Sequence, residues 1–285
     1  MSRAAVGAYC ACALIWGTTW FAIRVCIADY PTLVALALRF VIAALVLLPI
    51  ALRTRPWPRG RAWGWLVAAG LLDACAYLLV YLGEERVSGA IAAVLYGTQP
   101  LILALLLQVA RIERITRRHM IGAIISLVGV AVLFLDRLDV SVHQAIGVVM
   151  VIGSVAVATG YSMIMKQHSG GIPRVVSTTI FLAVTAIALG IVAVIAHDPI
   201  PWPPAVDATI ALLYLALVGS VAAFLFYFWL LDQTSLLVTS TLVFVFPLVA
   251  LVTDALFERD LPLDARAYLG VAITLGGLAV SLRRS

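Results

Sequence analysis

The sequence contains an internal repeat, and this repeat constrains the fold more than any other feature. Residues 85–101 align without a gap with residues 232–248, and residues 120–132 align with residues 268–280. In the first pair of segments an acidic residue, a serine and a proline recur in register, and in the second pair two glycines recur. The chain is therefore expected to consist of two related halves.

Most of the chain is too apolar for a water-soluble domain. Hydrophobic residues make up 64% of it, charged residues make up 12%, and the mean hydropathy is +1.11. A helix crosses a hydrocarbon core of roughly 30 Å with about 20 apolar residues. We expect such membrane-spanning helices at 5–27, 31–52, 63–83, 87–109, 118–136, 144–166, 174–196, 207–231, 235–257 and 265–282.

These ten spans divide evenly between the two halves. We expect a first five-helix repeat at 1–139 and a second at 140–285. Because each repeat has an odd number of spans, the second must enter the membrane with the opposite orientation. The sequence thus predicts an all-α integral membrane protein with ten transmembrane helices in two inverted five-helix repeats. That arrangement is typical of alternating-access transporters.

The basic residues indicate the orientation. With the N-terminus in the cytoplasm, thirteen of the 19 lysines and arginines fall on the cytoplasmic side, four fall in the opposite loops, and Arg24 and Arg39 fall within spans. The positive-inside rule then predicts that both termini are cytoplasmic. Loop 53–61 is rich in arginine and its counterpart 197–207 has no lysine or arginine, as an inverted repeat requires. The net charge of +5 therefore needs no nucleic-acid partner.

The first 28 residues also loosely imitate a cleaved signal peptide. Removing them would leave nine spans and break the repeat, so we expect them to stay. The preference for arginine over the single lysine is typical of a GC-rich bacterial genome. We therefore expect a multi-pass protein of the bacterial cytoplasmic (inner) membrane.

Asp73 and Arg39 are charged residues at the same depth of the membrane. Asp73 lies about 15 Å into its span at 1.5 Å per residue, and Arg39 reaches a similar depth from the other side. Asp73 could line a cavity and bind a substrate ammonium group or a proton. Alternatively, the two residues form a buried charge pair with a purely structural role, since membrane proteins use paired charges in both ways.

Pro100 and Pro247 occupy equivalent positions in the two repeats. A proline inside a helix removes one backbone hydrogen bond and releases the carbonyl group four residues earlier, here those of Tyr96 and Val243. We expect these prolines to act as hinges near a binding region. Gln99, directly before Pro100, adds a donor and acceptors.

Aromatic and hydroxyl side chains recur at the middle depth of several spans. Asp73, Tyr77 and Tyr81 share one helical face, and the equivalent face of the eighth span carries Ser220, Phe224 and Phe228. Aromatic stripes are more often packing than binding sites, but their convergence favours an amphipathic ligand. The candidate substrate-binding residues are Trp16, Thr19, Trp20, Asp73, Tyr77, Tyr81, Tyr96, Gln99, Tyr161, Ser162, Phe224 and Tyr227.

Small residues form one face of the fifth span and one face of the tenth. Such faces allow helices to approach closely, so we expect a scaffold contact between halves or between protomers. The residues are Gly122, Ser126, Gly129, Gly270, Thr274 and Gly277.

The segment 13–24, with Trp16 and Trp20, closely resembles the opening of EamA-type domains in the drug/metabolite transporter superfamily. Residues 36–40, around Arg39, the Pro100 region and Pro247 resemble that family too. The resemblance covers essentially the whole chain and implies a ten-helix exporter of small metabolites with a central cavity. The second repeat lacks the two tryptophans, so we expect the halves to contribute unequally to binding.

Within this family, bacterial amino-acid exporters suit the aromatic and weakly charged interior best. We therefore predict export of neutral amino acids, aromatic ones included, with broad specificity, by a monomer or weak homodimer surrounded by lipid. The ammonium would bind Asp73 or the Tyr96 carbonyl, and the carboxylate would bind Gln99, Thr19 or a tyrosine hydroxyl.

Two other classes of function stay open. A multidrug or quaternary-amine exporter would use the same rings through cation–π contacts. An integral-membrane enzyme is the weaker alternative, because the sequence has no Gly-x-Ser-x-Gly motif and no metal-spaced histidine cluster. We expect no cofactor and no metal, and the four cysteines fit small packing residues.

Overall fold

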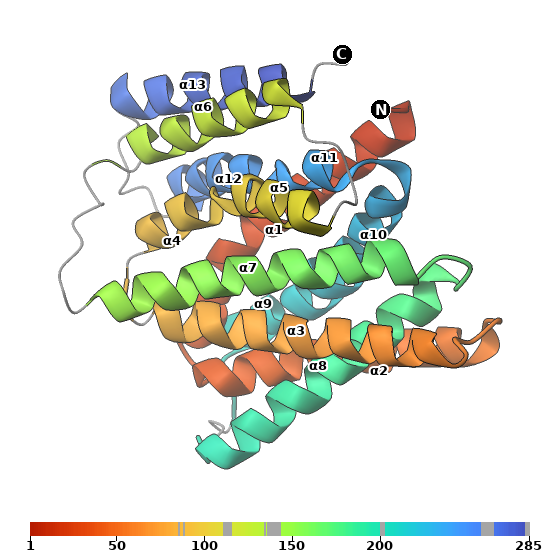
Figure 1. Cartoon of the computed structure of the whole chain (residues 1–285). Helices are drawn as coiled ribbons and strands as arrows, with labels where there is room; N and C mark the ends of the chain where they lie inside the picture. The colour runs from red at the N-terminus through yellow and green to blue at the C-terminus, as the bar shows by residue number, and fades with distance from the viewer. Residues whose placement is uncertain are drawn as a thin grey trace. The chain divides into compact units, whose positions relative to one another are not determined.

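A computed structural model describes residues 1–84, 86, 87, 89–110, 116–133, 135, 144–199, 203–257 and 265–282 (Figure 1). Over these residues the chain is helical and has no strand. It divides into two compact units, each built from parts of both repeats. The first unit is Met1–Cys75 with Gly160–Gln233, and the second is Ala76–Thr159 with Thr234–Ser285.

The helices of the first unit are α1 (Arg3–Ile27), α2 (Thr32–Arg53), α8 (Arg174–Ala196), α9 (Val206–Ala216), the π-helix η3 (Leu217–Ala222) and α10 (Ala223–Gln233). Those of the second unit are α4 (Gly89–Tyr96), α5 (Gln99–Ala110), α6 (Arg117–Leu133), α11 (Leu236–Ser240), α12 (Leu242–Phe257) and α13 (Ala265–Leu282). Helices α3 (Arg61–Glu84) and α7 (Ala145–His168) run from one unit into the other.

Eight helical stretches among the described residues are long and apolar enough to cross a membrane. The predicted fifth and tenth spans correspond to the shorter helices α6 and α13, of 17 and 18 residues. The predicted fold class, an all-α membrane protein, is confirmed. The repeat boundary predicted at residues 139 and 140 lies outside the described residues.

The predicted span 87–109 is two helices rather than one. Helix α4 ends at Tyr96, a turn follows at Gly97 and Thr98, and α5 begins at Gln99. Pro100 therefore lies in the first turn of a helix, where its missing N–H is tolerated. The Thr98 hydroxyl donates to the Leu95 carbonyl oxygen at 2.6 Å. This bond competes with the helical pattern and is one reason for the interruption.

The predicted span 235–257 is interrupted in a similar way. Helix α11 ends at Ser240 and α12 begins at Leu242, with Thr241 between them. The Thr241 hydroxyl donates to the Val238 carbonyl oxygen at 2.7 Å. Pro247 lies inside α12. Both spans are thus interrupted before the proline, at a threonine that binds the carbonyl three residues earlier.

Helices α6 and α13 pack through glycines that repeat between the two halves. A Cβ atom on Gly122 would lie 2.7 Å from the Gly277 carbonyl oxygen, and one on Gly270 would lie 2.9 Å from the Gly129 carbonyl oxygen. The sequence repeat aligns Gly122 with Gly270 and Gly129 with Gly277. The same contact is therefore made twice, as a two-fold relation between the repeats requires.

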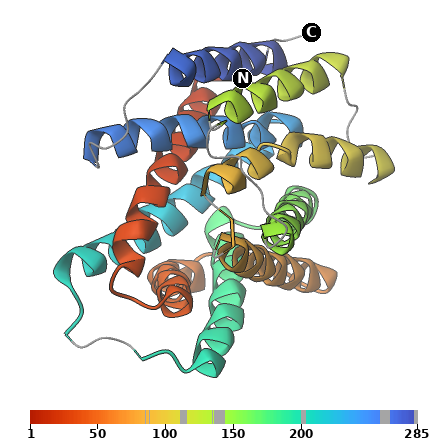
Figure 2. The ribbon, with the colours of Figure 1, turned by 90° about the vertical axis from the view of Figure 1, so that its left-hand side faces the viewer.

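The two helices of this pair run in opposite directions. The start of α6 lies against the end of α13, because Gly122 meets Gly277 and Ser281. Its end lies against the start of α13, where Gly270 meets Leu133. Figures 1 and 2 both draw α6 and α13 side by side. We call this contact the glycine seam, and its antiparallel course agrees with inverted repeats.

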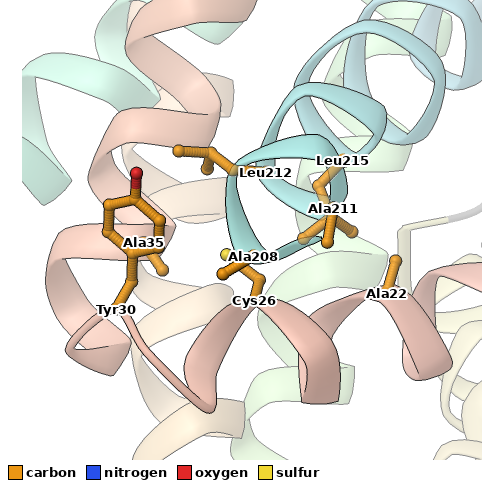
Figure 3. Packing of buried hydrophobic residues seen from close by; sticks show 8 residues of the cluster. All are labelled: Ala22, Cys26, Tyr30, Ala35, Ala208, Ala211, Leu212 and Leu215. Carbon is orange, nitrogen blue, oxygen red and sulfur yellow. The ribbon is translucent and has the colours of Figure 1, made fainter. Parts of the chain in front are cut away.

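In the first unit, the end of α1 packs on the start of α9 (Figure 3). The Asp29 carboxylate accepts a hydrogen bond from the Ala205 N–H at 2.9 Å, and the Tyr30 and Thr209 hydroxyls lie 3.2 Å apart. These contacts fix the beginning of α9. They therefore also fix the rotation of this helix about its own axis. The buried residues of this cluster are Ala22, Cys26, Tyr30, Ala35, Ala208, Ala211, Leu212 and Leu215.

The glycine seam gives a test with a neighbouring control. We expect Gly277→Ala to lower the free energy of unfolding by about 1–3 kcal/mol, because the added methyl group meets backbone of α6. No described atom lies within 4 Å of a Cβ on Gly276, so Gly276→Ala should leave stability unchanged or slightly raised. Thermal unfolding of the purified protein in mild detergent measures both, and equal effects would contradict the seam.

Candidate functional site

The eighth span contains a π-helical turn, Leu217–Ala222, between α9 and α10. The sequence predicted an uninterrupted span at 207–231 and gave no sign of this turn. The Ser220 hydroxyl donates to the Leu215 carbonyl oxygen, five residues earlier, at 3.0 Å. π-Turns are rare and occur frequently at functional sites. The turn is therefore the first structural marker of a site in this unit.

Two side chains from other helices bind the backbone of the π-turn. Arg39 of α2 is 2% exposed and donates from Nε to the Ser220 hydroxyl at 2.8 Å and from Nη2 to the Gly219 carbonyl at 3.1 Å. Trp16 of α1 donates from Nε1 to the same Gly219 carbonyl at 3.3 Å. Donors from α1 and α2 thus meet on one peptide group of the turn.

Six aromatic rings pack together beside this turn. The Trp16 ring centroid lies 5.6 Å from that of Phe224 and 5.1 Å from that of Tyr227. Most of the ring pairs are tilted or edge-to-face, the geometry that aromatic quadrupoles favour. We call these residues the aromatic cluster: Trp16, Tyr161, Phe181, Phe224, Tyr227 and Phe228.

The phenylalanine rings of the aromatic cluster pack closely on one another, and a pair of hydroxyl groups lies at the edge of the cluster. Phe224 is 1% exposed and Phe228 3%, so their rings bury one another. The hydroxyls of Ser162 and Tyr227 lie 2.9 Å apart, and both residues are buried. A ligand could enter only if the rings separate, and it would then meet this hydroxyl pair.

Asp73 lies on α3 next to α8 and is fully buried. The Thr185 hydroxyl donates to Asp73 Oδ2 at 3.0 Å, while Oδ1 has no hydrogen-bond partner among the described residues. The same hydroxyl lies 3.0 Å from the carbonyl oxygen of Phe181, a member of the aromatic cluster. A buried carboxyl oxygen without a hydrogen-bond partner is energetically unfavourable. Asp73 is therefore a candidate for binding a ligand next to the rings.

The predicted charge pair between Arg39 and Asp73 stays a prediction. The hydrogen bonds described above join Arg39 to the π-turn and Asp73 to Thr185. Each residue therefore has a role in its local structure besides any mutual neutralisation.

Two further predicted residues lie on α1. The Thr19 hydroxyl donates to the Trp16 carbonyl oxygen at 2.6 Å, and its methyl group faces Gly219 of the π-turn. Trp20 is half-buried and lies outside the ring contacts described for the aromatic cluster. Thr19 thus belongs to the surroundings of the turn, and the predicted binding role of Trp20 stays a prediction.

The remaining predicted residues lie in the second unit. The Tyr77 and Tyr81 ring centroids are 6.4 Å apart. The Ser154 hydroxyl donates to the Ala76 carbonyl at 2.8 Å and lies 2.8 Å from the Tyr96 hydroxyl, which therefore donates to it. Gln99 is half-buried at the start of α5. Pro100 and Pro247 lie in the two interrupted spans, and their predicted hinge role is untested.

Phe181 and Thr185 were missed by the sequence reading, although they connect the aromatic cluster to Asp73. The sequence feature that could have indicated them is a set of hydroxyl residues in the otherwise apolar seventh span. These residues lie near its beginning, at 177–179, and in its middle, at 185. In the part of the chain that the structure describes, no group of three metal-ligating side chains occurs.

The sequence profile of the EamA-like transporter family matches residues 3–135 and 145–283. Protein PecM of Dickeya dadantii is 26% identical over 270 residues, which cover 93% of this chain and 88% of PecM. The uncharacterized inner membrane transporter YedA of Escherichia coli K12 is 28% identical over 251 residues, covering 86% and 79%. A known crystal structure matches 99% of this chain and 97% of its own with a TM-score of 0.82 at 20% identity, and so shares the fold.

The bond between Thr185 and Asp73 can be tested with valine substitutions on α8. We expect Thr185→Val to lower the free energy of unfolding by about 1–3 kcal/mol, because it removes the donor to a buried carboxyl group. The Thr178 hydroxyl is buried without a partner among the described residues, so Thr178→Val should be neutral or stabilising. Thermal unfolding in detergent compares the two, and a smaller loss for Thr185→Val would contradict the assignment.

Proposed function

The chain belongs to the EamA-like transporter family, and on this premise we propose that it exports neutral amino acids, aromatic ones included, by alternating access. Membership makes it a membrane transporter. The choice of substrate rests on one observation: a cluster of aromatic rings lies beside a buried carboxyl group with one oxygen lacking a hydrogen-bond partner among the described residues.

The two ends of an amino acid find complementary groups in the first unit. The ammonium group needs an acceptor, which Asp73 Oδ1 supplies. The carboxylate needs donors, which the hydroxyls of Ser162, Tyr227 and Thr19 supply. An apolar or aromatic side chain fits the rings, and rings of varied orientation accept side chains of different shape, which supports broad specificity.

Binding requires the aromatic cluster to open. Phe181, Phe224 and Phe228 each contact one another and are almost fully buried. For a substrate to separate these rings, α10 must move relative to α8 within the first unit. For the second unit, taken by itself, we propose that the interrupted spans with Pro100 and Pro247 act as hinges and that Tyr77, Tyr81, Tyr96 and Gln99 bind substrate during transport.

The environment follows from the same family relationship. YedA is named an inner membrane transporter, and we propose the bacterial inner membrane for this chain, with both termini in the cytoplasm and a monomer or weak homodimer. No cofactor is invoked, and homologues named as transporters give no support to catalysis.

A multidrug or quaternary-amine exporter is the second candidate. The same rings would hold an organic cation by its charge, with Asp73 as counter-ion. The two candidates differ in the carboxylate of the ligand, which only an amino acid presents to the hydroxyl pair of Ser162 and Tyr227.

The deciding experiment is uptake into proteoliposomes containing the purified protein. We expect saturable uptake of radiolabelled L-phenylalanine and L-leucine that each amino acid inhibits competitively, and no uptake of tetraphenylphosphonium. Liposomes without protein give the background. Transport of the cation without transport of either amino acid would overturn the proposal in favour of the second candidate.

Asp73→Asn should reduce L-phenylalanine uptake by about tenfold, the equivalent of 1.4 kcal/mol, because it removes the charge that faces the ammonium group. The matched control is Asp232→Asn, since Asp232 forms an ion pair with Arg174 at the surface, 3.0 Å apart. The control should transport normally. If folded Asp73→Asn transports at the wild-type rate from pH 5 to 8, Asp73 neither binds the ammonium nor carries a proton.

A further inference from the structure

We propose that Arg39 is a positioning residue of the substrate site. Its hydrogen bonds stabilise the π-turn Leu217–Ala222, in which the backbone bonds run to the fifth residue back and not the fourth. This hydrogen-bond register determines where Phe224 and Tyr227 lie against Trp16. The inference deepens the proposed function, because it assumes that the aromatic cluster receives the substrate.

A π-turn in an apolar helix needs support from outside the helix. Its hydrogen-bond pattern is rarer and less regular than that of the α-helix, and lipid supplies no donors for its carbonyls. Here the Gly219 carbonyl accepts from both Arg39 and Trp16. The Ser220 hydroxyl accepts from Arg39 Nε and passes its own hydrogen to the Leu215 carbonyl. One guanidinium group thus stabilises two successive residues of the turn.

The packing around Gly219 leaves little room for another conformation. A Cβ atom at this position would lie 2.9 Å from the Thr19 methyl group and 3.5 Å from Arg39 Nη2. Helices α1 and α2 therefore both close on the turn at its glycine. The surrounding helices fit this backbone in its present register, with the carbonyl exposed to both donors.

The register of the turn controls the rings that follow it. The start of α9 is fixed by the Asp29 and Tyr30 contacts described above. An α-helix rotates by about 100° per residue, so removing the extra residue of a π-turn would rotate α10 by that angle relative to α9. Phe224 and Tyr227 would then leave the Trp16 ring. The geometry of the aromatic cluster consequently depends on Arg39 through the π-turn.

A positioning role and a charge-neutralising role make different predictions for lysine. Arg39→Lys retains the positive charge but lacks the planar fork that reaches Ser220 and Gly219 together. If Arg39 only neutralises Asp73, lysine should replace it. If Arg39 holds the turn, lysine should fail although the charge remains.

The test combines hydrogen exchange with transport kinetics on the full-length protein. We expect Arg39→Lys and Ser220→Ala each to speed amide exchange at residues 217–228 by about tenfold, with the remaining helices unchanged. Both variants should raise the KM for L-phenylalanine more than they lower kcat, because the rings are misplaced before transport begins. The control is Ser177→Ala, another buried serine, whose hydroxyl donates within its own helix to the Arg174 carbonyl.

The outcomes separate this inference from the proposed function. Wild-type exchange at residues 217–228 in folded Arg39→Lys and Ser220→Ala would overturn it, as would faster exchange with an unchanged KM. If amide exchange is faster in the variants but the wild-type protein transports no amino acid, the proposed substrate is refuted. The stabilisation of the π-turn by Arg39 would still be supported. If Arg39→Lys does not fold, Ser220→Ala decides the question, because it removes the Nε acceptor and leaves the charge buried as before.

Discussion

The structure depends above all on satisfying backbone carbonyl groups where no water can reach them. A regular α-helix does so within itself, and three departures from it here lie beside a side-chain donor. Thr98 and Thr241 bind carbonyls at the two interrupted spans, and Ser220, Arg39 and Trp16 bind those of the π-turn. At these three places in the described helices, a side-chain donor thus accompanies the irregular backbone.

Symmetric and asymmetric regions of the molecule serve different purposes. The glycine seam makes the same contact twice, with matching residues from both repeats. The aromatic cluster does not: Trp16 comes from the first repeat, whereas its ring partners Phe224 and Tyr227 come from the second. The structure thus contains a symmetric helix pair and, separately, a ring cluster to which each repeat contributes different side chains.

The sequence was sufficient for features that depend on local composition. Hydropathy located the spans, and the repeat of Pro100 and Pro247 pointed to the two interrupted ones, although the interruptions lie at Thr98 and Thr241. The π-turn could not be predicted, because its support comes from Arg39, some 180 residues away in sequence. Phe181 and Thr185 were not predicted as site residues for a related reason. An apolar helix has no sequence periodicity that distinguishes a face packed on a ring cluster from a face in contact with lipid.

The glycine seam has the geometry of an isologous dimer interface whose two partners are joined in one chain. In such an interface each residue of one repeat contacts a residue of the other, and the equivalent residues make the same contact. A larger side chain in one repeat must therefore be accommodated by the other. Residues of the aromatic cluster are under no such constraint, because their contacts are not repeated by equivalent residues of the other repeat. A single substitution can therefore alter the aromatic cluster by itself, whereas a larger residue in the seam requires a compensating change in the other repeat.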